Sequence, residues 1–86
     1  MPYYSDKHTI LAPFRKSWDI VPHATNELPN ITRAVMASTD GVIVTGYLES
    51  DPDNLYTTFA LKGSIYYFEA FKRVVTVTGG TLKGYV

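Results

Sequence analysis

The sequence predicts an all-β fold: a small antiparallel β-sandwich or barrel-like domain with an extended N-terminal arm. Three observations lead to this prediction. Short runs of β-branched and aromatic residues recur along the chain, polar or glycine-containing turns separate them, and no stretch stands out as a helix. The chain has 86 residues, which suits one domain. We place the arm at residues 1–16 and the single β domain at residues 17–86.

About six strands are expected in this domain. The turn Asp40-Gly41 separates two β-prone runs, and glycine can adopt the positive φ that a tight hairpin turn requires. Pro22 ends the first strand or places it at a sheet edge. Polar loops are expected at 23–30 and 49–54. The expected strands are 17–21, 32–37, 42–48, 55–61, 64–77 (one strand, or two that meet near Lys72-Arg73) and 81–86.

The aromatic segment after Ser64 requires a choice between helix and strand. Ile65, Phe68 and Phe71 recur at helical spacing, so periodicity alone does not decide. However, Tyr67 stands where a helix capping box would carry Glu or Gln, and aromatic residues suit a pleated surface. We therefore expect a strand at 65–75 in the centre of a sheet. Ile65, Tyr67 and Phe71 should face the core, and Phe68 should face outward.

Composition excludes several classes of function. Eight basic and eight acidic residues balance, so the chain lacks the positive charge that nucleic acids or anionic membranes attract. The absence of cysteine excludes disulfides, thiolate zinc sites and a cysteine nucleophile. No apolar run is long enough for a transmembrane helix, and the first residues lack the layout of a signal peptide.

Catalytic and metal-binding signals are weak. His8 and His23 lie in expected irregular chain, and nothing in the sequence pairs either of them with a carboxylate and a nucleophile. The loop 49–54 supplies oxygen ligands but lacks the glycine and the closing glutamate of a calcium-binding EF-hand loop, so a solvated turn is expected. Gly79-Gly80 indicates a turn. We expect no enzymatic activity, no cofactor and no metal site.

The aromatic content favours an assembling subunit. Seven tyrosines, four phenylalanines and one tryptophan exceed what so small a core can bury, and protein interfaces are enriched in such residues. The alternative is that tyrosines are half-buried on the outer faces of a sheet. The arm cannot bury its own apolar residues and so requires a surface. The expected contacts with a partner are Tyr3, Tyr4, Ile10, Leu11, Phe14, Trp18, Tyr66 and Phe68.

Short sequence patches carry a resemblance to a known family. They are Leu11-Ala12-Pro13, Ile20-Val21-Pro22, Asn26-Glu27-Leu28-Pro29, Thr32-Arg33-Ala34-Val35, Asp40-Gly41-Val42-Ile43-Val44, the segment 65–74, and the segment 76–81. In this order they resemble the small spike-base proteins of tailed phages and phage-like gene transfer agents. The similarity spans roughly Thr9 to Val86. The chain departs from the family pattern at His23-Ala24, at Tyr66, at Gly79-Gly80-Thr81 and in the acidic loop 49–54.

The resemblance implies a virion structural protein without enzymatic activity. Such a protein lies on the outer surface of the head and anchors a spike or fibre. Its implied partners are itself, as a pentamer or trimer, a capsid protein, and a spike or fibre protein. Two alternatives remain open: a tail or baseplate adaptor, and a small phage-encoded inhibitor that binds a host protein.

Overall fold

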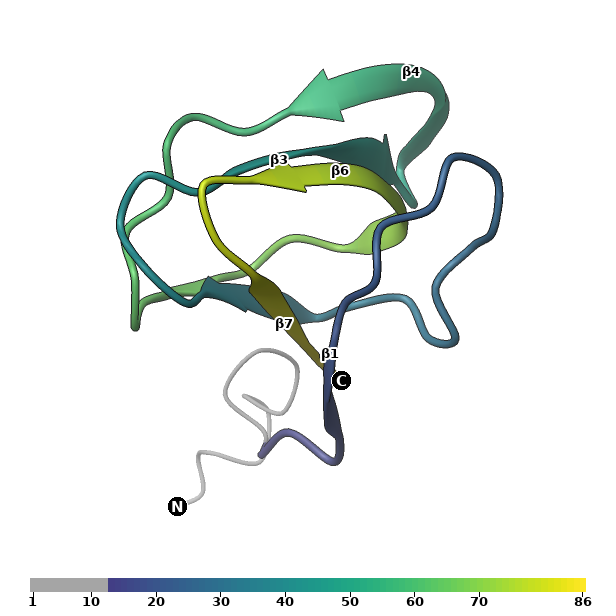
Figure 1. Ribbon diagram of the computed structural model, residues 1–86. Helices are drawn as coiled ribbons and strands as arrows, with labels where there is room; N and C mark the ends of the chain where they lie inside the picture. Colours follow the sequence, from purple (N-terminus) through teal and green to yellow (C-terminus); the bar gives the residue numbers. More distant parts are fainter. Residues whose placement is uncertain (1–12) are drawn as a thin grey trace.

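The computed structural model describes residues 13–86, which form two antiparallel sheets that face each other (Figure 1). One sheet has four strands in the order β1-β7-β2-β5, and the other has three in the order β4-β3-β6. The strands are β1 (Ser17–Asp19), β2 (Ala34–Ala37), β3 (Ile43–Leu48), β4 (Asp51–Thr57), β5 (Tyr66–Tyr67), β6 (Phe71–Thr78) and β7 (Leu82–Tyr85). This architecture confirms the predicted all-β sandwich.

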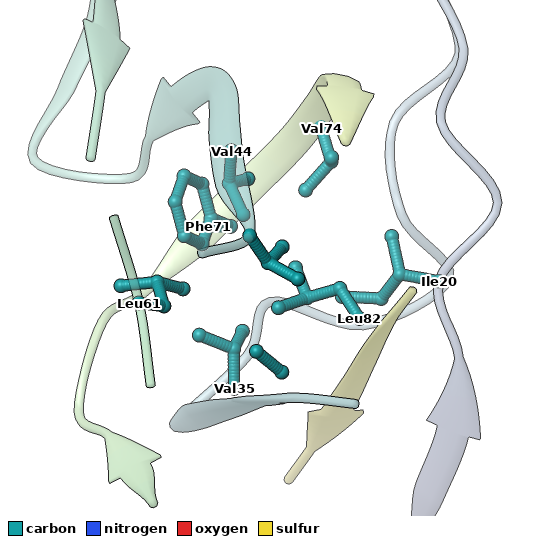
Figure 2. Close-up of a cluster of buried hydrophobic side chains, with 9 residues drawn as sticks. Ile20, Val35, Val44, Leu61, Phe71, Val74 and Leu82 are labelled. Carbon is teal, nitrogen blue, oxygen red and sulfur yellow. The ribbon is translucent and has the colours of Figure 1, made fainter. Parts of the chain in front are cut away.

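A single core lies between the two sheets (Figure 2). The four-stranded sheet contributes Val35 and Leu82, and the three-stranded sheet contributes Val44, Phe71 and Val74. Alternate residues of a strand point to opposite faces, which explains why Val35 is buried while its neighbour Met36 is only half-buried. The core residues are Ile20, Val35, Ala37, Val42, Val44, Leu61, Phe71, Val74 and Leu82.

Two glycines determine where the chain turns and how closely the strands approach. Gly41 has a φ of 91° in the turn between β2 and β3, as the sequence predicts for the Asp40-Gly41 pair. Gly46 lies in β3 opposite Val74 of β6, where a β-carbon would collide with the main-chain oxygen of Arg73. The close approach of β3 to β6 at this position therefore requires a residue without a side chain.

The expected central strand at 65–75 is wrong. The chain forms β5 at the edge of one sheet, crosses between the sheets, and forms β6 at the edge of the other. Phe71 is fully buried and Phe68 is 55% exposed, which confirms the predicted directions of these two side chains. Tyr67 packs against the core, as predicted, whereas Ile65 is 46% exposed and not inward-facing.

Thr32 fixes the crossing between β5 and β6. Its hydroxyl donates to the main-chain oxygen of Glu69 (2.6 Å) and accepts from the main-chain nitrogen of Phe71 (2.8 Å). Its own nitrogen donates to the oxygen of Phe71 (3.2 Å). These bonds satisfy backbone groups that leave one sheet and enter the other, so the crossing needs no glycine or proline.

The free edges of the three-stranded sheet are protected in different ways. Main-chain nitrogens of His23, Leu28 and Thr32 donate to oxygens of β6, so the loop that precedes β2 covers this edge. Figure 1 shows that loop beside β6. The other edge is β4, which begins at Asp51 and therefore includes most of the expected loop 49–54. Its charged residues, its proline and a register shift against β3 discourage pairing with another strand.

Candidate interaction surfaces

Residues 13–16, which we call the foot of the arm, pack on the outer face of the four-stranded sheet. The ring of Phe14 lies 5.3 Å from that of Tyr66 and 5.1 Å from that of Tyr85, and the two tyrosine rings are 5.1 Å apart. The guanidinium of Arg33 lies 4.9 Å from the centre of the Phe14 ring. Burial, followed by the neighbouring Tyr66, raises the pKa of Tyr85. We call Phe14, Tyr66 and Tyr85 the aromatic triad.

Backbone hydrogen bonds hold the same stretch in place. The nitrogens of Arg15 and Lys16 both donate to the oxygen of Val86, and the nitrogen of Val86 donates to the oxygen of Lys16. Residues 15–16 thus extend the pairing of β1 with β7. The side chains of Arg15 and Lys16 line a shallow hollow together with Phe14, Ser17 and Tyr85.

A second hollow opens between β1 and the loop that covers β6. It measures about 310 Å³, and its lining includes Trp18, Leu28 and Val21, of which Val21 is 78% exposed. The indole of Trp18 packs against the core, and its Nε1 is buried without a hydrogen-bond partner among residues 13–86. Trp18 therefore contributes to folding and also borders a surface depression.

A third hollow, which we call the Glu69 hollow, lies where β3 ends and the chain crosses into β6. It measures about 280 Å³ and is lined by Leu48, Ser50, Tyr56, Phe68, Glu69 and Ala70. The phenol of Tyr56 donates to Oε2 of Glu69 at 3.1 Å, whereas Oε1 of Glu69 is buried without a partner in the described chain. Desolvation, followed by the charge of Glu69 and this hydrogen bond, raises the pKa of Tyr56.

The described part of the chain has neither a metal-binding cluster nor a helix that could span a membrane. Within residues 13–86, no three His, Asp or Glu side chains gather closely enough to hold a metal ion. In the same range, no helix has the length and apolar character needed to cross a membrane.

One solved structure shares this arrangement over its full length. It is a chain of the capsid of a native gene transfer agent particle, computed with C5 symmetry. The two chains superpose with a TM-score of 0.70 and 24% sequence identity, over 100% of each chain. At this identity the similarity shows a shared fold. No protein-family model matches the sequence, and a search of curated proteins found no match.

The expected contact residues do not form one surface. Phe14 and Tyr66 meet in the aromatic triad, whereas Trp18 and Phe68 border two other hollows. Tyr3, Tyr4, Ile10 and Leu11 lie outside the described residues.

Sequence reasoning missed Tyr85 and Glu69 as members of these surfaces. Tyr85 alternates with the buried Gly84 along the last strand, a signal that could have placed it on the outer face. No local signal could have identified Glu69, because the strand prediction placed its side chain beside inward-facing residues.

Proposed function

We propose that this chain is a structural subunit of a phage-like particle, located on the outer surface of the head, where it forms the base that anchors a spike or fibre. The observation that carries the proposal is the full-length superposition on a capsid chain of a gene transfer agent particle. The sequence resemblance to spike-base proteins supports the same role independently. The role is structural and involves no catalysis.

The partners in this proposal are further copies of the chain, a capsid protein and a spike or fibre protein. A fivefold ring is favoured over a trimer, because the capsid that contains the similar chain was computed with C5 symmetry. In a closed ring each copy uses the same two surfaces, so one small chain can cover a symmetric site on a particle. The separate hollows beside Trp18, Glu69 and Arg15 are candidates for such surfaces.

Quantitative mass spectrometry of purified particles tests this role. The chain should be present in a fixed ratio to the major capsid protein, and cryo-electron microscopy should place it on the head. Density on the tail would instead support the adaptor alternative. Absence from particles, together with capture of one host protein by the free chain, would support the inhibitor alternative.

A further inference from the structure

We propose that the Glu69 hollow receives a basic side chain from the Arg15-Lys16 pair of a second copy of this chain. The proposal rests on the proposed function, since it names the contact by which subunits of such a base would join. It is carried by a carboxylate oxygen of Glu69 that lacks a donor among residues 13–86, by the walls of the hollow, and by the basic side chains that form no ion pair in the same range.

The carboxylate of Glu69 is only half satisfied. Oε2 accepts a hydrogen bond from Tyr56, but Oε1 is buried and accepts none from residues 13–86. The main chain at Glu69 is held at both ends, because its nitrogen donates to Tyr67 and its oxygen accepts from Thr32. A fixed, partly desolvated carboxylate oxygen without a donor is costly, and a cation that enters beside it would remove that cost.

The hollow also suits the body of a long basic side chain. Phe68 is exposed at its rim, Tyr56 forms part of its wall, and Leu48 adds an aliphatic surface. Aromatic faces attract guanidinium and ammonium groups, and aliphatic surface accommodates the methylene stem. The protein already uses such contacts, since Arg33 lies over Phe14 and Arg73 lies 4.3 Å from the centre of the Tyr47 ring.

Most basic side chains within residues 13–86 are already engaged. Lys72 pairs with Glu27 at 3.3 Å, and Lys83 pairs with Asp19 at 3.4 Å. The two arginines described above lie over aromatic rings. The remaining basic residues in this range are Arg15, Lys16 and Lys62, for which the structure shows no ion pair.

Of these three, the adjacent Arg15 and Lys16 are the best candidates. Both are exposed, and hydrogen bonds to Val86 hold their backbone, so they project from a fixed position. Arg15 and Lys16 border a different hollow from the one that contains Glu69. Within one copy, the two basic residues and the acidic residue therefore lie on separate surfaces. Complementary charges on separate surfaces of identical chains favour a head-to-tail contact, which closes into a ring when the rotation between copies allows it.

Sedimentation velocity of the full chain over a range of concentrations tests the contact. The double variant Arg15→Glu with Lys16→Glu reverses two exposed charges and should weaken self-association by at least about tenfold. Lys62→Glu is the control, because it reverses one charge at an exposed site that forms no ion pair within residues 13–86. Glu69→Gln keeps an acceptor for Tyr56 but removes the charge, and it should weaken self-association to a similar degree.

A charge exchange provides the decisive measurement. Glu69→Lys combined with Arg15→Glu and Lys16→Glu should restore the self-association that Glu69→Lys alone, or the Arg15→Glu and Lys16→Glu pair alone, weakens. Circular dichroism shows whether the Glu69→Lys chain folds. If it does not, Glu69→Gln is combined with Arg15→Glu and Lys16→Glu instead. This combination should self-associate no more weakly than Arg15→Glu with Lys16→Glu alone, because both changes remove the same contact. A wild-type chain that is monomeric at about 100 µM, or arm variants that assemble like Lys62→Glu, would overturn the proposal. Neither result would affect the particle stoichiometry by which the proposed function is judged.

Discussion

The phenol of Tyr56 donates a hydrogen bond of 3.1 Å to Oε2 of Glu69, which ties β4 to the segment that crosses between the sheets. The pKa of Tyr56 is raised above 10.0, mainly by desolvation and then by the Glu69 charge. A raised pKa in the folded state means that the associated stability is fully present below pH 10 and is lost as pH rises through the folded pKa. We expect the free energy of unfolding to fall in this alkaline range.

Urea denaturation at a series of pH values from 8 to 11.5 measures this effect. Tyr56→Phe cannot ionise, so its free energy of unfolding should fall less steeply above pH 10 than that of the wild type. Part of the fall should remain in this variant, because the pKa of Tyr85 is also raised. Identical pH profiles for the two proteins would contradict the assignment to Tyr56.

Phe71 and Phe68 should respond differently to truncation. Phe71 is completely buried in the core, so Phe71→Ala should destabilise the fold by about 3–5 kcal/mol. Phe68 is exposed beside Glu69, so Phe68→Ala should leave the monomer folded and weaken assembly. Circular dichroism with urea measures folding, and sedimentation measures assembly. The opposite pattern would mean that the two side chains have exchanged roles.

Thr32 should contribute more to the free energy of unfolding than its size suggests. Thr32→Val keeps the volume but removes the hydroxyl that bonds Glu69 and Phe71, leaving buried backbone groups without partners. We expect a loss of about 1–3 kcal/mol in the free energy of unfolding. Thr76→Val, at an exposed position of β6, is the control and should change it by less than about 0.5 kcal/mol. Equal effects in urea denaturation would argue against the proposed importance of the hydroxyl.

Two truncations distinguish the contribution of residues 1–12 from that of Phe14. Removal of residues 1–12 should leave the circular dichroism of the β domain unchanged, because the core is built from residues between Ile20 and Leu82. Removal of residues 1–14 also deletes Phe14 from the aromatic triad and should cost about 1 kcal/mol more, since this ring is half-buried. Under the proposed function, both truncations should abolish incorporation into particles. Normal incorporation of either would show that the arm is not the anchor.

Local chemistry allowed much of the fold to be predicted. Asp40-Gly41 has turn chemistry between two β-branched runs, and the hairpin forms there. Residues with opposite local preferences misled the prediction at β4, where Asp51, Pro52 and Asn54 lie in a strand. An exposed edge strand tolerates such residues because it bonds to a neighbour on one side only.

The crossing between the sheets could not be predicted, because its cause is distant in sequence. Phe68, Glu69 and Ala70 contain no turn residue, and the bonds that redirect the backbone come from Thr32, 37 residues before Glu69. The Glu69 hollow and the aromatic triad could not be predicted either, because their residues are also distant in sequence. The pairing of Tyr56 with Glu69 and the meeting of Phe14 with Tyr85 both depend on this tertiary arrangement.

The position of β7 has a consequence for how the chain acquires its structure during synthesis. These four residues follow all the other described strands in sequence, yet they lie between β1 and β2 and pair with both. The four-stranded sheet therefore cannot form until β7 itself has left the ribosome. Until then, Val35 and Ile20 lack the strand that covers them, and the nascent chain must remain soluble with apolar residues exposed. Pairing between residues so distant in sequence also slows folding, so newly made chains have a long interval in which chaperones can bind them.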